Sequence, residues 1–305
     1  MKIPKTVRQA IRSPQCNEWV VAMETRIKAL IDKGLLAQID GLPDGVNLLE
    51  TKWVFDPKVD EDGYIVRFRA RIVAKGFKQK PGLDFKDTFS PVTRLSSFRL
   101  LVALARQSGW KIWQGDVNNA YLNAKLKIKQ YIGGIEGFGD NMYRVDQALY
   151  GLRQSGREWN EELDGWMKKY GFTQCETEPC VYFYAKGGAM AFVLICVDDV
   201  VITTNSEEFK CEFFAALNNE YDFNDLGLLT NYLGIRFRQT DAETVLDQEQ
   251  YAREILERFD LVEGHANKSG IPMETTVKLK KCEQADEPNW HHIPGKVPYR
   301  EAVGV

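Results

Sequence analysis

The sequence predicts an α+β protein in which helices cover one face of a central sheet. Segments with helical spacing of apolar residues and segments rich in β-branched and aromatic residues follow one another without the regular alternation of a doubly wound parallel sheet. The 305 residues are enough for about two domains, and a hydrophobic share of 44% is typical of a chain that buries a core. No apolar run reaches the length of a membrane-spanning helix, and no secretory signal is expected.

Five segments carry apolar residues at the spacing of one helix face. They cover residues 13–34, 96–108, 159–170, 206–217 and 251–259. Ser13 and Pro14 are typical of the N-cap and first turn of the first helix. Ser206, followed by two glutamates, is typical of the start of the fourth.

Eight short segments predict strands because they are rich in β-branched and aromatic residues. They cover residues 52–55, 65–74, 111–114, 181–184, 189–197, 200–204, 232–237 and 244–246. The Asp-Gly pair at residues 62–63 lies between the first two and predicts a β-hairpin. From Gly264 onward the chain is polar without a strong period, so no element is predicted there.

Charge and cysteine content exclude little on their own. The 40 basic and 43 acidic residues leave a net charge of −3, which by itself indicates no partner. The six cysteines have neither metal-binding nor disulfide spacing, and the three histidines all follow residue 264. We therefore expect reduced thiols and no His-dependent catalytic triad.

The strongest local signal is a pair of adjacent carboxylates, Asp198 and Asp199, between two β-branched strands. Aspartates favour turns, so the pair could simply form a hairpin. However, neighbouring carboxylates repel each other, and keeping both ionised beside apolar strands is costly without a cation. Oxygen ligands of this kind suit Mg²⁺.

A third carboxylate, Asp116, follows the predicted strand 111–114 where we expect a helix to begin. It could be an ordinary helix N-cap. Only the fold could bring Asp116 to the distant pair. Three carboxylates together could hold two Mg²⁺ ions about 4 Å apart, as in enzymes that transfer nucleotidyl groups.

A basic segment and a glycine-containing loop favour an anionic ligand. Residues 64–80 hold six basic side chains and no acidic one, and three arginines alternate with apolar residues along the strand. A triphosphate or a nucleic-acid backbone suits such a face, although it could also be the solvated face of an edge strand. In the loop, Gly151 and Gly156 bracket Arg153, and Arg157 follows at a predicted helix start, a pattern of low specificity.

In this order, the segments resemble the reverse transcriptases of copia-type LTR retrotransposons over nearly the whole chain. The matching stretches are residues 52–55, 69–77, 88–92, 114–123, 148–154, 197–199, 232–235 and 298–304. The resemblance implies a right-hand polymerase that copies RNA or DNA into DNA, with fingers, a palm built on a ferredoxin-like antiparallel sheet covered by helices, and a thumb. The implied parts are a helical segment (1–48), fingers and palm (49–240), a thumb (241–285) and the start of a connection segment (286–305).

The resemblance also implies roles for individual residues. Asp116, Asp198 and Asp199 match the catalytic carboxylates, which would hold two Mg²⁺ ions, with Mn²⁺ as a substitute. The implied dNTP-binding residues are Arg69, Arg71, Lys75, Asn119, Ala120, Tyr121, Gly151 and Gln154, and the implied primer grip is Tyr232, Leu233, Gly234 and Ile235. Tyr121 matches an aromatic gate against a ribose 2′-OH, although it could be a buried tyrosine. The grip residues could equally be a half-buried strand.

Departures from the family leave alternatives open. Cys196 stands where most of the family has tyrosine, residues 132–138 lack a usual proline, and the chain ends at Val305, where the family continues into RNase H. RNase H and integrase functions are then expected from other chains. The alternative hypotheses are a truncated or decayed copy that folds and binds template–primer without polymerising, and a two-metal nuclease. The expected partners are dNTPs and an RNA or DNA template–primer, without a membrane, and the expected location is cytoplasmic, particle-associated, or nuclear.

Overall fold

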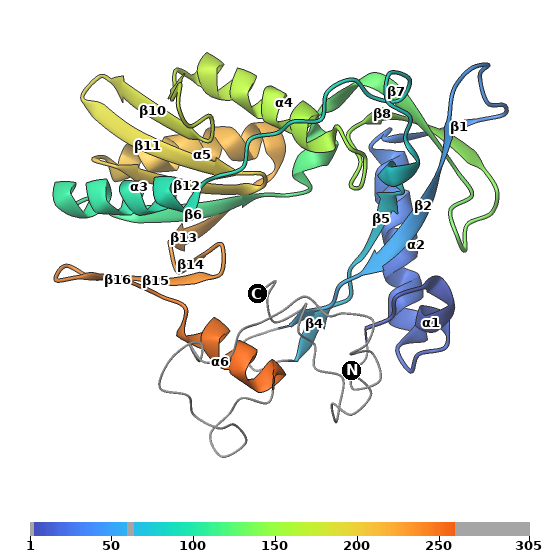
Figure 1. The fold of residues 1–305 in the computed structure, drawn as a ribbon, viewed down its shortest axis with the longest axis horizontal. Coiled ribbons are helices and arrows are strands. Elements are labelled where there is room, and N and C mark those ends of the chain that lie inside the picture. Colours follow the sequence, from blue (N-terminus) through green and yellow to red (C-terminus); the bar gives the residue numbers. More distant parts are fainter. Residues whose placement is uncertain (1–2, 60–63, 260–305) are drawn as a thin grey trace, which may run out of the picture. The chain divides into compact units, whose positions relative to one another are not determined.

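The structure is a computed structural model that describes residues 3–59 and 64–259 (Figure 1). The chain divides after Leu229 into two compact units. The boundaries predicted at residues 48, 240 and 285 stay predictions. The Asp62–Gly63 turn, most of the predicted thumb and the predicted connection segment lie outside the described residues.

The first unit contains two main sheets. The first has the strand order β1 (Leu36–Ile39), β8 (Met142–Gln147), β7 (Lys125–Gly133), β2 (Leu48–Phe55) and β5 (Ala70–Ala74). The second has the order β13 (Phe223–Leu228), β6 (Ile112–Val117), β12 (Asp199–Thr204), β11 (Ala189–Cys196), β10 (Val181–Lys186) and β9 (Thr173–Gln174). The six-stranded sheet is antiparallel throughout, as predicted for an α+β fold.

The five predicted helices are all present, with shifted ends. They are α2 (Cys16–Asp32), α3 (Leu95–Ser108), α4 (Ser155–Tyr170), α5 (Glu207–Tyr221) and α6 (Glu249–Arg258). Ser206 caps α5 as predicted, because its Oγ accepts a hydrogen bond from the Phe209 amide at 3.1 Å. The prediction that Ser13 caps this helix is wrong, because α2 begins at Cys16. Ser13 instead follows a short helix, α1 (Val7–Ile11), and its Oγ donates to the carbonyl of Ala10 in that helix.

The predicted hairpin is confirmed, but its second strand is interrupted. β2 and β5 pair antiparallel, with Lys52 opposite Val73. The segment before β5 leaves the sheet, because β4 (Ile65–Arg67) pairs with β3 (Lys58–Val59) in a separate ribbon. Phe68, between the two pieces, packs edge-on against Trp19 with ring centroids 4.7 Å apart, which ties the strand to α2.

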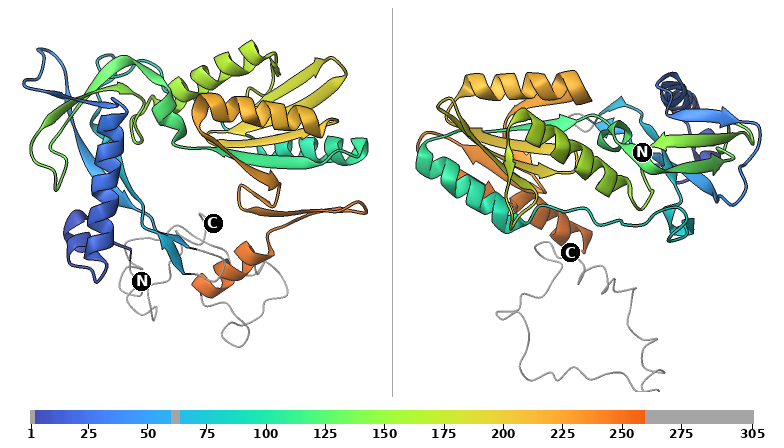
Figure 2. Two further views of the ribbon diagram at one scale, coloured as in Figure 1. Left: turned by 180° about the vertical axis from the view of Figure 1, so that it is seen from behind. Right: turned by 90° about the horizontal axis from the view of Figure 1, so that it is seen from above.

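Helices cover both faces of the six-stranded sheet rather than one. On one face, α4 and α5 supply a shared aromatic core, with Trp166 and Phe213 rings 6.0 Å apart. The buried apolar residues Phe98, Leu101 and Val102 of α3 lie outside that core, and α3 contacts β12, so α3 covers the other face (Figure 2). β12 is buried at five successive positions because both of its faces are covered.

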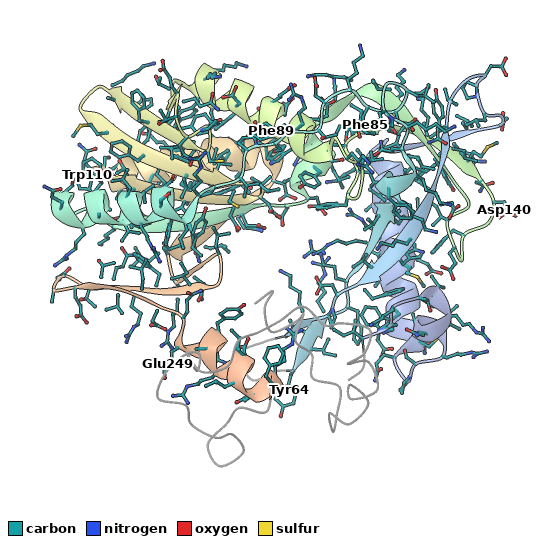
Figure 3. All side chains as sticks on the ribbon, viewed as in Figure 1. Tyr64, Phe85, Phe89, Trp110, Asp140 and Glu249 are labelled. Carbon is teal, nitrogen blue, oxygen red and sulfur yellow. The ribbon has the colours of Figure 1, made fainter. Side chains whose placement is uncertain are left out.

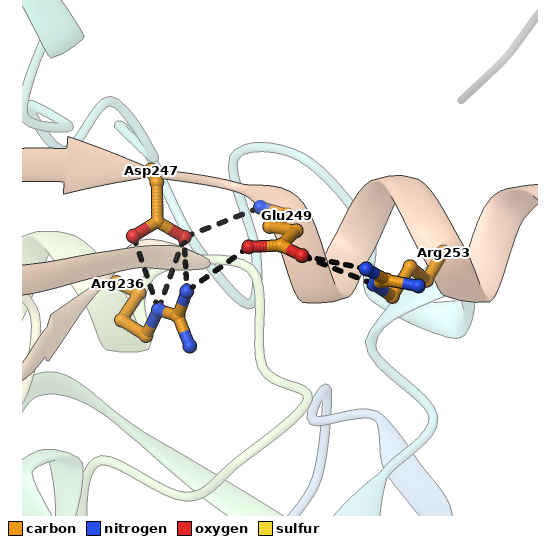
Figure 4. A network of polar contacts seen from close by, with 4 residues as sticks. All are labelled: Arg236, Asp247, Glu249 and Arg253. Atoms are coloured by element: carbon orange, nitrogen blue, oxygen red, sulfur yellow. Dashed lines mark hydrogen bonds and ion pairs between the residues drawn. The ribbon is translucent and has the colours of Figure 1, made fainter.

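The described part of the second unit is a three-stranded sheet followed by α6. Its strands are β14 (Asn231–Tyr232), β15 (Ile235–Gln239) and β16 (Thr244–Asp247). Arg236 links the sheet to the helix: its guanidinium donates to Asp247 at 3.0 Å and lies 3.5 Å from Glu249, which in turn accepts from Arg253 (Figure 4). The Arg236 hydrogen bond holds the pKa of Asp247 below its usual value.

None of the helices in the described residues is long and apolar enough to cross a membrane.

Candidate active site

Two of the three predicted carboxylates face each other across paired strands. Asp116 on β6 lies opposite Asp199 on β12, and Asp198 occupies the turn between β11 and β12. The Val117 amide donates to the Asp198 carbonyl at 2.8 Å, which joins this turn to β6. Asp116 is thus a strand residue and not a helix N-cap. The fold brings together carboxylates that are far apart in sequence.

The turn that carries Asp198 is conformationally strained. Val197 has a φ of 58°, a left-handed conformation that is unfavourable for a β-branched residue. The indole nitrogen of Trp159, on α4, donates to the Val197 carbonyl at 2.7 Å and helps to hold this conformation. Such strain is typical of functional turns, where the surrounding structure fixes a side chain in a required place.

The carboxylates destabilise one another's charged forms. Burial, together with the charges of Asp198 and Asp116, raises the pKa of Asp199 to about 6. Burial and the Asp198 charge also raise the pKa of Asp116, whereas Lys58 and Arg69 act in the opposite direction. A bound divalent cation would remove this repulsion, and the all-oxygen donor set suits Mg²⁺. Within the described residues, no three acidic, His or Cys side chains converge closely enough to form a metal site.

The carboxylates open into a cleft of about 1130 Å³ within the first unit. Its other wall is basic and comes from α2 and the strands around β4 and β5. The polar residues that line the cleft include Arg26, Lys58, Arg67, Arg69, Arg71, Asn119, Tyr150, Asp116, Asp198 and Asp199. One cleft therefore places guanidinium groups opposite a carboxylate cluster.

Two of the three predicted basic triphosphate contacts line this cleft. Arg69 and Arg71 do, and Arg71 Nη2 lies 3.2 Å from Asp56 Oδ2. Lys75 does not line the cleft; its Nζ lies 2.6 Å from Glu50 Oε2. Lys75 and Lys78 together hold the pKa of Glu50 at about 2.

The segment after β6 brings an aromatic pair next to the carboxylates. Asn119 has a φ of 53° and lines the cleft, Ala120 is fully buried, and Tyr121 lies in a 3₁₀ turn (Ala120–Asn123). The Tyr121 ring is half-buried against Tyr150, with centroids 4.7 Å apart. Burial and the Asp198 charge raise the pKa of Tyr121, but neither Ala120 nor Tyr121 lines the cleft.

Gly151 and Gln154 do not line the cleft. A Cβ on Gly151 would lie 2.2 Å from the Ala74 carbonyl oxygen, so this glycine permits a close backbone approach to β5. Gln154 is buried, and its side chain accepts from Gln79 Nε2 at 3.0 Å. Gln154 lines a smaller cavity of about 240 Å³ together with Phe85 (Phe85 is labelled in Figure 3).

The predicted primer-grip residues form a tight hairpin in the second unit. Tyr232 on β14 pairs with Ile235 on β15, and both side chains are buried. Leu233 and Gly234 have φ values of 48° and 77°, as in a two-residue hairpin turn. The strand predicted over residues 232–237 is therefore interrupted by a turn, and the function of this hairpin as a primer grip stays a prediction.

Sequence reasoning missed Arg26 and Tyr150, which both line the cleft. Tyr150 is within a stretch that resembles the family, so its ring was a visible candidate. Arg26 gave no such signal, because charged residues are ordinary on the polar side of an amphipathic helix. Cys196 lies opposite Asp199 in the β11–β12 pairing, and burial raises the pKa of its thiol.

Comparison with known proteins assigns the family. A family model described as reverse transcriptase (RNA-dependent DNA polymerase) matches residues 37–275. The chain belongs to this reverse transcriptase family. The match, together with the α+β architecture, confirms the fold class expected from the sequence.

Curated relatives of this reverse transcriptase include plant transposon proteins. The retrovirus-related Pol polyprotein from transposon TNT 1-94 of Nicotiana tabacum is 32% identical over 311 residues, covering 99% of this chain and 23% of the relative. The corresponding protein from transposon RE2 of Arabidopsis thaliana is 31% identical and covers 97% of this chain and 20% of the relative. The chain thus spans about a fifth of the length of these relatives. The predicted resemblance to copia-type reverse transcriptases is confirmed.

Proposed function

We propose that this chain is a DNA polymerase of a copia-type retrotransposon that copies RNA, and also DNA, by adding deoxynucleotides from dNTPs to a primer 3′-OH. The observation that carries the proposal is the shared cleft, in which Arg69 and Arg71 lie in one wall and Asp116, Asp198 and Asp199 in the other. Nucleotidyl transfer needs both: cationic side chains that bind and orient a triphosphate, and carboxylates that would hold metal ions beside the reacting phosphate.

The carboxylates would hold the metal ions that this chemistry requires. Asp116, Asp198 and Asp199 would hold Mg²⁺, or Mn²⁺ in its place, because they are all-oxygen donors whose mutual repulsion a cation relieves. Their side chains would have to move closer together to share the ions. Two such ions, when bound, lower the pKa of the attacking hydroxyl and stabilise the leaving pyrophosphate. The strained turn at Val197 and its hydrogen bond from Trp159 keep Asp198 next to β6.

The basic wall would bind and align the triphosphate. Arg69 and Arg71 offer planar guanidinium groups, which bind phosphate oxygens through paired hydrogen bonds. The Asp56 carboxylate, 3.2 Å from Arg71, fixes that side chain before the substrate arrives. A template–primer duplex would bring the primer 3′-OH to the carboxylate wall of the cleft.

Tyr121 would exclude ribonucleotides. Replacing it with Val should raise the incorporation of rNTP relative to dNTP by roughly 10- to 100-fold, because a steric contact with one small group is worth about 1–3 kcal/mol. The measurement is the ratio of kcat/KM for the two nucleotides on one template–primer. Tyr121→Phe retains the ring that packs on Tyr150 and should keep the original ratio. An unchanged ratio in a folded Tyr121→Val variant would identify Tyr121 as a packing residue only.

The proposed function is tested by extending a 5′-labelled primer on an RNA template and on the DNA template of the same sequence, with Mg²⁺ and all four dNTPs. We expect products longer than the primer on both templates. Products shorter than the primer would indicate a two-metal nuclease instead. A folded protein that binds the primer without extending it would be a chain that binds template–primer without polymerising. Cys196, which lies opposite Asp199 and stands where most of the family has tyrosine, favours that alternative.

A further inference from the structure

Arg26 is a cleft residue that precedes the residues matched by the family model. It lies on α2, whereas the family model begins at residue 37. Helix α2 contacts β5, which places Arg26 in the same wall of the cleft as Arg69 and Arg71. Helix α2, which precedes the span of the family model, therefore contributes a cation to the candidate active site.

The Arg26 guanidinium has hydrogen-bonding capacity that nothing in the described residues uses. Its Nη1 donates to the Asn119 side-chain oxygen at 3.1 Å, but its Nε and Nη2 are buried without a hydrogen-bond partner. None of the described carboxylates forms an ion pair with it. A buried donor without a partner costs free energy, and more so when the group is charged.

The surroundings of Arg26 favour the binding of an anion. Burial lowers the pKa of Arg26. Tyr150 acts in the opposite direction, and the charges of Arg69 and Arg71 each lower the pKa by less than Tyr150 raises it. Arg71 Nε is also buried without a partner. Asp56 forms an ion pair with Arg71, and the other carboxylates that line the cleft are exposed Glu18 on α2 and those at β6 and β12. A small ligand with several anionic oxygens would satisfy these donors together.

We propose that Arg26 binds phosphate oxygens of the incoming nucleotide's triphosphate together with Arg69 and Arg71. This inference rests on the proposed function, because it assumes that the cleft takes a nucleotide. The contact with Asn119 has a second consequence. Asn119 lies in the left-handed conformation three residues after Asp116, so binding at Arg26 is coupled to the segment that carries the carboxylate and Tyr121.

A nucleic-acid backbone offers the same phosphate chemistry, so the experiment must separate the two sources. A primer ended with a dideoxynucleotide allows the ternary complex to form without reaction. The dissociation constant of the next dNTP is measured on that complex by titration, and the dissociation constant of the template–primer is measured by fluorescence anisotropy. The variants are Arg26→Gln, Arg26→Lys and the matched control Lys28→Gln, which removes the same charge from an exposed position of α2.

We expect Arg26→Gln to raise the dNTP dissociation constant roughly 10- to 100-fold, the worth of one or two hydrogen bonds to a charged group. Arg26→Lys should raise the dNTP dissociation constant by less, because lysine keeps the charge but lacks the planar guanidinium that forms paired hydrogen bonds. Template–primer affinity should stay within about twofold, and Lys28→Gln should change neither constant. If Arg26→Gln fails to fold, the dNTP dissociation constant of Arg26→Lys tests the proposal: a rise supports it, and an unchanged constant contradicts it.

Two results would overturn the inference. One is an unchanged dNTP dissociation constant in the folded variant; the other is an equal loss of template–primer affinity, which would assign Arg26 to a backbone phosphate. If the unsubstituted chain binds no dNTP, the proposed function fails separately. Calorimetry with inorganic tripolyphosphate then tests Arg26 alone: binding that Arg26→Gln abolishes supports an anion site, and equal or absent binding contradicts it.

Discussion

Replacing Asp116 with Asn should lower the rate of nucleotide incorporation by about 1,000-fold or more and leave the fold intact. Asn has nearly the same shape but lacks the charge that would bind the metal ions, and metal-assisted stabilisation of the reacting groups is worth several kcal/mol. Stability should be unchanged or slightly higher, because the substitution removes repulsion with Asp198 and Asp199. Single-turnover incorporation and thermal unfolding, measured on the same preparation, check both expectations.

Glu18→Gln is the matched control for Asp116→Asn. Glu18 also lines the cleft, but it lies on α2, away from the paired strands that carry the carboxylates. Losing its charge should change the incorporation rate by no more than about threefold, as expected of an exposed group. Equal losses in the two variants would mean that the overall charge of the cleft, rather than Asp116 itself, supports the reaction.

Gly151→Ala should destabilise the first unit by about 3 kcal/mol. The new Cβ would lie 2.2 Å from the Ala74 carbonyl oxygen, and Gly151 has a φ of 92°, which a side chain disfavours. The Ala74 amide donates to the Tyr150 carbonyl at 2.8 Å, so the two segments cannot separate without losing a hydrogen bond. The unfolding midpoint should fall by roughly 6–12 °C.

Gly165→Ala is the control, because Gly165 is inside α4 and a Cβ there would meet no atom within 4 Å. Alanine favours a helix over glycine, so this variant should be neutral or more stable by up to about 1 kcal/mol. A Gly151→Ala variant with an unchanged midpoint but weaker dNTP binding would show that Gly151 serves the nucleotide, as the sequence resemblance implies, and not the packing of β5.

The carboxylate cluster could be predicted because its two parts carry local signals. Adjacent aspartates between apolar strands stand out in any sequence, and the stretch around Asp116 matches a known family. Their pairing could not be derived from spacing: it depends on the antiparallel register that places Asp116 opposite Asp199. The family resemblance implied that Asp116 lies near Asp198 and Asp199, and the pairing of β6 with β12 shows how they are arranged.

Three other features of the structure were not predicted from the sequence, two of them because they depend on tertiary packing. β7 alternates lysines with apolar residues and was predictable as a strand, but it was not predicted. The coverage of both sheet faces was visible only as the unbroken apolar run of β12, which a helix segment can also show. Arg26 becomes notable only when α2 lies against β5 and leaves two of its nitrogens buried without partners.

The most direct test is incorporation of dTMP into oligo(dT) annealed to poly(rA) with Mg²⁺, by the unsubstituted chain and by Asp198→Asn. We expect steady incorporation by the unsubstituted chain, loss of the signal with EDTA, and at least about a 1,000-fold lower rate for the folded Asp198→Asn variant. A folded unsubstituted chain that incorporates no nucleotide, or an Asp198→Asn variant as active as its parent, would contradict the proposed function.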